Sequence, residues 1–350
     1  MLRRFPCRLL TTLAQGRSNP MGEKQLVLVT GGAGYIGGHV VRQLLARGYA
    51  VRNLDKLAFG DAAVRDLAAN PDYDQLVGDI RHIEDVVAAT RGAYGVIHLA
   101  GIVGDPACDL DHDATHTINL EATKLMVECC KYTGIRRFVF ASTCSVYGAA
   151  DDYVLNEGSL LNPVSLYAET NLQSERIIVK GFEGTDVVPT IVRFATVYGA
   201  SPRMRFDLVV NIMTAKAVKE GKVRVFGGDQ WRPNVHCQDA AAGLIACLEA
   251  PEEKVKNEVF NIGSDGQNYR IRELGELVAG CVPGARVEVM GESPDRRSYR
   301  VSFEKARQVL GFAPSFRVED GVREVRDLLA SGAVADHLDD RYYNVRYLYR

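Results

Sequence analysis

The sequence lacks a surplus of charge of either sign, a long hydrophobic run and a cysteine motif. It holds 42 Lys and Arg residues against 44 Asp and Glu, a formal net charge of −2, so we expect neither nucleic acid nor an acidic membrane surface as a partner. No apolar run reaches the roughly 20 residues that span a bilayer. The eight cysteines include no CxxC pair, which argues against a disulfide framework or a zinc site. What remains is the composition of a globular protein with reduced thiols.

Acidic residues are missing from the start of the chain. The first twenty residues, MLRRFPCRLLTTLAQGRSNP, contain four arginines, and the first carboxylate is Glu23. An Arg-rich, acid-free start is typical of a mitochondrial presequence, and a disordered extension ahead of Met21 is the alternative. We set residues 1–22 apart from the fold and expect a cytoplasmic protein, or one of the mitochondrial matrix if the segment is a presequence.

The folded pattern begins at residue 23 with a strand, a glycine-rich turn and a helix. An apolar run at residues 26–29 precedes the turn, and apolar residues at helical spacing follow it as far as Gly48. Further buried-strand runs alternate with helical patterns: AVRNLD, DQLVGDI, GVIHLAG, RRFVFAST and VVPTIVRFATVYG. This alternation predicts a Rossmann-type, doubly wound parallel sheet over residues 23–200. Residues 201–350 are predicted to form mainly a smaller substrate-binding lobe, with a late strand–helix return through NEVFNIGS.

The turn TGGAGYIG carries the first chemical signal. It places Gly31, Gly34 and Gly37 between a strand and a helix, where glycines let the backbone approach a pyrophosphate at the helix N-terminus. Asp55 follows the second strand, in position to accept a hydrogen bond from a ribose 2′-hydroxyl. Because a carboxylate there repels a 2′-phosphate, the sequence favours NAD over NADP.

The stretch CDLDHDATHTIN offers a possible metal site. His112 and His116 are separated by one helical turn and have acidic neighbours, which is compatible with metal ligation. A polar loop leading into a helix N-terminus explains the same residues. We expect no metal.

The order of the motifs resembles a known family. The glycine turn, GDI at residues 78–80, HLAG at 98–101, STCSVYG at 142–148 and the tyrosine of YAETN occur as in the extended short-chain dehydrogenase/reductases. The chain most resembles their NAD-dependent nucleotide-sugar epimerase/dehydratase branch, from about Lys24 to the 310s. The resemblance implies NAD as cofactor, a nucleotide-diphosphate sugar as substrate and a homodimer.

The resemblance also implies roles for individual residues. The catalytic positions are Thr143, Tyr167 and Asn171, with Tyr167 exchanging a proton with the reacting sugar oxygen and Thr143 hydrogen-bonding it. The implied cofactor-binding residues are Gly31, Gly34, Tyr35, Ile36, Gly37, Asp55, Asp79, Ile80, Leu99, Ala100, Gly101, Tyr167 and Asn171. The implied substrate-binding residues are Thr143, Thr196, Arg203, Arg205, Asn211, Arg232, Arg297 and Arg300. Arg232 in GGDQWRPN is the main candidate for gripping the diphosphate, because a guanidinium binds phosphate through two bonds.

Two features depart from the pattern of the family. In sugar 4,6-dehydratases an Asp-Glu pair follows the serine or threonine and eliminates water; Cys144 and Ser145 stand there in this sequence, which disfavours dehydration. Asn171 stands where a lysine is usual, four residues after the tyrosine. A tyrosine starts near pKa 10, so forming phenolate at pH 7 without that charge costs roughly 4 kcal/mol.

We therefore expect an NAD-dependent nucleotide-sugar 4-epimerase that works through a transient 4-keto sugar, weakened by Asn171. A 4-keto-sugar reductase is the alternative within the same class of enzyme. A non-catalytic NAD-binding scaffold subunit is the alternative from outside it. Asn171 and the presequence-like start favour the scaffold, whereas Thr143, Tyr167 and Arg232 argue against it.

Overall fold

The structure, a computed structural model, describes residues 24–292 and 297–347. Residues 1–22, for which a presequence and a disordered extension were the two expectations, lie outside the described residues. Most of the remaining chain is built around one sheet of seven parallel strands in the order β11-β7-β5-β4-β1-β2-β3. The strands are β1 (Leu26–Thr30), β2 (Ala50–Asp55), β3 (Tyr73–Val77), β4 (Gly95–His98), β5 (Arg137–Thr143), β7 (Val188–Phe194) and β11 (Glu258–Ile262). The predicted Rossmann-type parallel sheet is confirmed.

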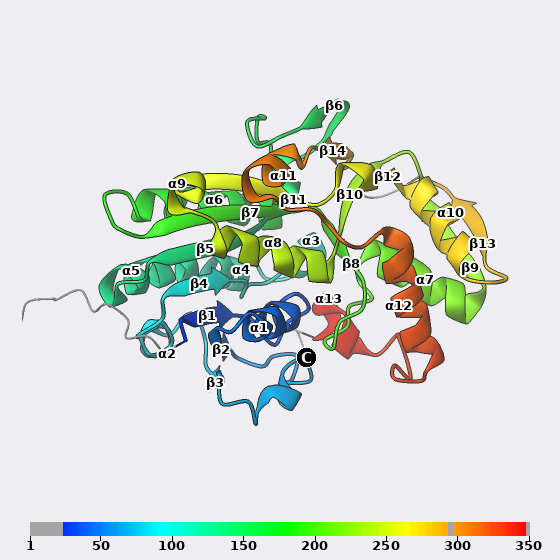
Figure 1. The fold of residues 1–350 in the computed structure, drawn as a ribbon. Helices are drawn as coiled ribbons and strands as arrows, with labels where there is room; N and C mark the ends of the chain where they lie inside the picture. Colours follow the sequence, from blue (N-terminus) through cyan, green and yellow to red (C-terminus); the bar gives the residue numbers. More distant parts are fainter. Residues whose placement is uncertain (1–23, 293–296, 348–350) are drawn as a thin grey trace, which may run out of the picture.

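Helices cover both faces of this sheet (Figure 1). On one face α1 (Gly37–Ala46) packs beside α8 (Cys237–Glu249), and on the other α5 (Ala122–Thr133) packs between α2 (Ile83–Thr90) and α6 (Leu166–Gly181). Alternate residues of β1 enter opposite cores: Val27 and Val29 join α1 and α8, whereas Leu28 joins α2, α5 and α6. Because both of its faces are covered, the central strand β1, with the sequence LVLVT, is apolar at all but its last position.

The strand order creates a crevice. From β1 the sheet continues to β2 on one side and to β4 on the other. The chain therefore leaves the carboxyl ends of the neighbouring strands β1 and β4 in opposite directions, toward β2 and toward β5. Doubly wound sheets bind ligands at such a switch point.

A smaller unit stands beside the carboxyl ends of the strands (Figure 1). Its core joins α7 (Val209–Glu220), α10 (Ile271–Cys281) and α12 (Val318–Ala330) to the parallel pair β9 (Lys222–Phe226) and β13 (Arg286–Met290). Between the units, β10 (Trp231–His236) pairs with β8 (Thr196–Tyr198) and β12 (Asn268–Arg270), and β6 (Ala150–Leu155) pairs with β14 (Tyr299–Val301). The segment NEVFNIGS contains β11, which returns to the edge of the large sheet.

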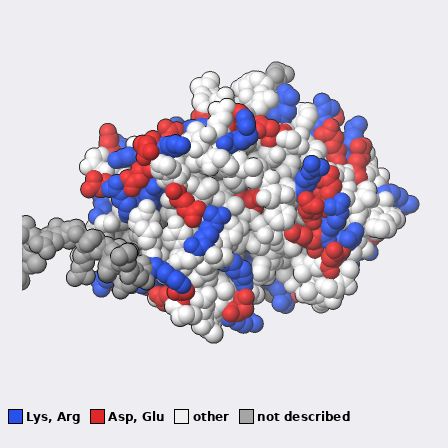
Figure 2. Space-filling view, viewed as in Figure 1, with Lys and Arg blue, Asp and Glu red and all other residues white. Residues whose placement is uncertain are grey.

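The remaining helices are short or lie near the C-terminus. They are α3 (Asp105–Cys108), α4 (His112–Thr115), a π-helix (His116–Glu121), α9 (Glu252–Val255), α11 (Glu304–Leu310), α13 (Asn344–Tyr347) and four 3-10 turns (Arg65–Leu67, Cys144–Tyr147, Asp265–Gln267 and Asp340–Tyr342). Within residues 24–292 and 297–347, no helix has the length and apolar character needed to cross a bilayer. Figure 2 shows acidic and basic side chains interleaved on the face that it presents, most densely over α12.

Candidate active site

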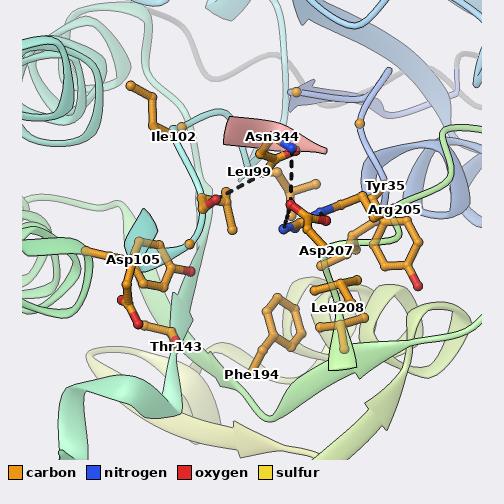
Figure 3. A pocket seen from close by; sticks show the side chains of 18 of the residues that line it. Tyr35, Leu99, Ile102, Asp105, Thr143, Phe194, Arg205, Asp207, Leu208 and Asn344 are labelled. Carbon is orange, nitrogen blue, oxygen red and sulfur yellow. Dashed lines mark hydrogen bonds and ion pairs between the residues drawn. The ribbon is translucent and has the colours of Figure 1, made fainter. Parts of the chain in front are cut away.

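A cavity of about 930 Å³ lies between the carboxyl edge of the large sheet and the smaller unit. The glycine-rich turn and the loop after β2 line one end, and residues of β9, β10 and the segment before β14 line the other. In Figure 3, Asp105 and Thr143 lie on one side of this cavity, and Arg205, Asp207 and Asn344 lie on the other. Both units therefore contribute side chains to one site.

The glycine-rich turn, called the phosphate cradle below, has no room for a side chain at two of its glycines. Gly31 has φ +76°, and a Cβ there would lie 2.9 Å from the Ala100 nitrogen. A Cβ on Gly37, the first residue of α1, would lie 2.1 Å from the Gly31 carbonyl oxygen. The turn therefore packs tightly on itself and on the loop after β4, and it lines the cavity at the N-terminus of a helix, where N–H groups and the helix dipole favour an anion.

Two carboxylates lie at the ends of β2 and β3. Asp55 accepts hydrogen bonds from the Ala33 nitrogen (3.0 Å) and the Leu57 nitrogen (2.8 Å), so its position is fixed at the cavity wall. Burial raises the pKa of Asp55, and these two N–H groups oppose the rise. Asp79 is bonded by Arg81 through Nε (3.0 Å) and Nη2 (2.7 Å), and this interaction lowers its pKa to about 2.

Nearly all the predicted cofactor-binding residues line the cavity. Those that do are Gly31, Gly34, Tyr35, Ile36, Gly37, Asp55, Asp79, Ile80, Leu99, Ala100, Gly101 and Tyr167. Asn171 is not among the lining residues.

Thr143 and Tyr167 both line the cavity. Thr143 ends β5, and Tyr167 stands in the first turn of α6, whose N-cap Ser165 accepts a bond from the Ala168 nitrogen. Burial is the largest cause that raises the pKa of Tyr167 above its usual value, with Cys108 and Asp105 adding to it, whereas Arg205 and the Thr143 hydroxyl act in the lowering direction. The cavity therefore holds two hydroxyls, one of which can exchange a proton with a ligand.

Asn171 is turned away from this pair. Its Nδ2 donates to the Tyr167 backbone carbonyl oxygen (2.8 Å), one helical turn back, and only 7% of the residue is exposed. The amide stabilises its own helix and does not reach the tyrosine hydroxyl. Residue 171 therefore brings no positive charge to the tyrosine hydroxyl.

The arginines predicted to bind a diphosphate occupy different places. Arg232 on β10 and Arg297 line the cavity, and Arg232 donates to the carbonyl oxygens of Trp231 and Arg297. Nη1 of Arg297 forms an ion pair with Oδ2 of Asp105 (2.5 Å), which joins the two units across the cavity. Arg300 does not line the cavity; its guanidinium lies 5.1 Å from the ring centroid of Trp231. We infer that Arg300 supports β10 rather than substrate.

Strand β8 and the segment after it supply three further predicted residues. Thr196, Arg203 and Arg205 line the cavity. Arg205 is held by Asp207 through two bonds, from Nε (2.8 Å) and from Nη2 (3.0 Å).

Asn211, in α7, is fully buried and does not line the cavity. It accepts from the Gly199 nitrogen (3.0 Å) and donates to the Tyr35 hydroxyl (3.1 Å). Its amide therefore holds the loop to the glycine-rich turn, a scaffolding position.

Several lining residues were absent from the sequence prediction. Asp105, Asp207, Ser145 and Tyr299 stand close to predicted residues in the chain, so a wider window around each motif is the signal that finds them. Asn344 lines the cavity from the last ten residues of the chain, where no motif marks it.

The histidines considered for a metal site do not form one. In the part of the chain that the structure describes, no three His, Cys, Asp or Glu side chains are placed to hold a metal ion. Asp111 instead caps α4 by accepting a bond from the Ala114 nitrogen (2.8 Å).

The residues present fit a dinucleotide. The cradle excludes a Cβ at Gly31 and at Gly37, the fixed carboxylate of Asp55 retains free lone pairs for ribose hydroxyls, and Asp79 and Ile80 line the adjoining wall. When bound, NAD supplies the hydride acceptor and donor. Gly31, Gly34 and Gly37 would hold its pyrophosphate, and Asp55 its ribose.

Comparisons with known proteins agree with this site. The model of the NAD dependent epimerase/dehydratase family matches residues 27–263. The UDP-glucose 4-epimerase of Lactobacillus helveticus is 29% identical over 322 residues, covering 85% of this chain and 94% of that protein.

Two solved structures extend the likeness to three dimensions. The Thermus thermophilus UDP-glucose 4-epimerase complex with NAD has a TM-score of 0.77 and 28% identity, and the match covers 89% of this chain and 100% of that one. The dTDP-glucose 4,6-dehydratase DesIV of Streptomyces venezuelae, solved with NAD bound, has a TM-score of 0.79 and 26% identity, with 88% of this chain and 98% of that one covered. The chain belongs to the NAD dependent epimerase/dehydratase family, and it is an enzyme whose cofactor is NAD.

Proposed function

We propose that this enzyme epimerises a nucleotide-diphosphate hexose at C4 through a transient 4-keto sugar. One observation carries the proposal: the hydroxyls of Thr143 and Tyr167 line the same cavity as the glycine cradle and the arginines Arg232 and Arg297. Residues suited to the oxidation of a sugar hydroxyl and residues suited to binding the diphosphate of its nucleotide therefore line one cavity.

The residues of the chain divide the work. Tyr167 takes the proton from the sugar hydroxyl as the ketone forms and returns it as the hydroxyl is restored. Thr143 donates a bond to the same sugar oxygen and keeps the tyrosine oriented. Arg232 and Arg297 hold the diphosphate by charge-assisted bonds. Since the proton removed in the first half is returned in the second, no other acid or base is required.

The same geometry disfavours dehydration. Eliminating water from C5 and C6 requires a carboxylate near the sugar to remove a carbon-bound proton. The positions after Thr143 are Cys144, which is completely buried, and Ser145. The Cys144 thiol is further disabled because burial raises its pKa far above the usual range.

Uridine is the favoured base. Relatives named UDP-glucose 4-epimerase are 26% to 29% identical over most of their length, and solved UDP-glucose 4-epimerases share the fold. These likenesses support a UDP-hexose as the first substrate to test.

The test is interconversion of UDP-glucose and UDP-galactose by the purified enzyme, followed by chromatography. We expect slow conversion in both directions without net consumption of NAD or NADH, and none in Tyr167→Phe. Arg232→Gln should weaken binding of UDP-glucose by about 2 kcal/mol, as expected for a lost charge-assisted bond, and leave NAD affinity unchanged.

Different outcomes identify the alternatives. Stoichiometric oxidation of NADH with a 4-keto sugar as acceptor would replace the epimerase with a reductase. If a broad panel of sugar nucleotides is neither bound nor converted while NAD is bound, the proposal is wrong and a scaffold role takes its place.

A further inference from the structure

Arg203 has a place that the family resemblance does not explain. The guanidinium carbon of this residue lies 3.8 Å from the ring centroid of Phe59, in the loop that follows β2. Arg203 is 6% exposed and lines the cavity together with Phe59, Asp55 and the glycine-rich turn. The residue therefore crosses from the segment after β8 to the cofactor end of the cavity, away from Arg232 and Arg297.

The charge of Arg203 is buried without an ion pair in the described part of the chain, although the charges of Asp207 and Asp55 act on it from a longer distance. Nη2 donates to the neutral amide oxygen of Asn344 (2.7 Å), and Nε is buried without a hydrogen-bond partner. Among residues 24–292 and 297–347, no carboxylate forms an ion pair with it, since Asp207 is engaged by Arg205. Burial, followed by the charge of Arg205, lowers the pKa of Arg203 to about 9. A buried guanidinium with an unbonded N–H is destabilising unless an anion pairs with its charge and accepts a hydrogen bond from that N–H.

The segment that carries Arg203 is fastened to the glycine-rich turn. Ser201 donates through Oγ to the Tyr35 carbonyl oxygen (2.8 Å), and the Tyr35 hydroxyl donates to the Gly199 carbonyl oxygen (2.6 Å). Arg203 comes two residues later. The phosphate cradle and the unpaired guanidinium are thus fixed to each other by short bonds.

Asn344 fixes the guanidinium from a third direction. Its Nδ2 donates to the Val103 carbonyl oxygen (3.1 Å), and its backbone nitrogen donates to Oδ2 of Asp207 (3.1 Å). Figure 3 shows these bonds converging at the edge of the cavity. One residue of the C-terminal segment thereby ties the loop after β4 to the loop after β8.

We propose that Arg203 binds the pyrophosphate of the dinucleotide cofactor, not that of the substrate, and that Asn344 positions it there. The C-terminal segment then acts as a latch that keeps NAD in the enzyme between turnovers. The inference concerns the cofactor, so it stands whichever sugar reaction the enzyme performs.

The test compares nucleotides that differ only in phosphate. Enzyme freed of bound nucleotide is titrated calorimetrically with NAD, ADP and adenosine, with excess UDP present to occupy the substrate end. Arg203→Gln should weaken NAD and ADP by about 30-fold, the loss of one charged bond, and leave adenosine unchanged. The rate of NAD dissociation should rise by a similar factor.

Matched variants separate this role from others. Arg203→Lys keeps the charge and should recover part of the affinity for ADP. Asn344→Ala removes the bond that positions the Arg203 guanidinium, so NAD should dissociate faster from this variant. Arg224→Gln removes an arginine that lines the same cavity from β9 and should leave NAD unchanged. If Arg203→Gln weakens the binding of adenosine as much as that of ADP, Arg203 only supports the loop that carries Phe59, and the proposal is wrong. If Arg203→Gln loses affinity for UDP while its affinity for NAD is unchanged, Arg203 binds the substrate and the proposal is wrong. Wild-type behaviour of all variants would also overturn the proposal.

Discussion

At the scale of single residues, the missing lysine has a candidate replacement. The neutral amide of Asn171 donates to the Tyr167 carbonyl oxygen, so this residue brings no charge to the tyrosine hydroxyl. The cation that does act on Tyr167 is Arg205, which lines the same cavity and lowers the pKa of the phenol against the larger effect of burial. The charge is thus supplied from across the cavity rather than from the same helix, and Asp207 reduces it by ion pairing.

Two substitutions should shift the pH dependence in opposite directions. Arg205→Gln removes the cation and leaves Asp207 unpaired, so the pKa of Tyr167 rises and the tyrosine limb of the pH–rate profile moves to higher pH. Asn171→Lys adds a cation one turn from the tyrosine and should move the limb to lower pH, with a gain at pH 7 of up to about a thousandfold. Asn171→Gln, which is neutral but longer than asparagine, is the control. It should change neither the position of the tyrosine limb nor the rate at pH 7. If the tyrosine limb stays in place in both Arg205→Gln and Asn171→Lys, neither position governs the pKa of Tyr167.

At the scale of elements, the position of α6 depends on a buried ion pair. Glu175, two turns beyond Tyr167, accepts from Nη2 (2.6 Å) and Nε (3.0 Å) of Arg193 on β7, and from the hydroxyl of Ser142 on β5 (2.5 Å). The side chains of the pair are 4% and 6% exposed. Because Ser142 adjoins Thr143, this network sets the distance between Thr143 and Tyr167.

Glu175→Gln should leave Arg193 as an unpaired buried charge. We expect the free energy of unfolding to fall by about 3–5 kcal/mol, measured by urea denaturation. The double variant Glu175→Leu, Arg193→Met should recover part of this loss, since no charge is then left unpaired. Glu252→Gln, which breaks the exposed ion pair with Arg136, is the control and should cost at most about 1 kcal/mol. Equal losses at the two sites would mean that the buried network does not hold α6.

The elements were predictable from sequence wherever the signal is local. The apolar strands, the glycine-rich turn, Asp55 and the position of Tyr167 in a helix are read from spacings of a few residues. The contacts of Arg203 were not predictable, because Phe59 and Asn344 lie far from it in the chain and belong to no motif. Asn211 and Arg300 were predicted to bind substrate because they stand near motifs, but neither lines the cavity, and their contacts are with other parts of the protein.

At the scale of the whole molecule, neither unit has a complete site. Arg297 of the smaller unit pairs with Asp105 of the larger one, and at the cofactor end Arg203 packs on Phe59 of the loop after β2. The cavity is thereby bridged at two places, so separation of the units requires breaking these contacts.

The last prediction concerns assembly, which the family resemblance suggests is a homodimer formed through α5 and α6. The outward side chains of these helices are mostly charged, among them Lys124, Glu128 and Arg176, with Tyr132 82% exposed beside them. An interface built on such a surface depends on ion pairs, so we expect a dimer at low salt that weakens at high salt.

Light scattering at micromolar concentration measures this directly. Tyr132→Glu should give monomers, because it places a carboxylate at the only large exposed aromatic ring of the described part of α5. Val289→Glu, on β13 at the opposite end of the molecule in Figure 1, should leave the dimer intact. A monomeric mass for the wild type at low salt would contradict the expectation. A dimer that Val289→Glu disrupts and Tyr132→Glu does not would place the interface on the smaller unit instead.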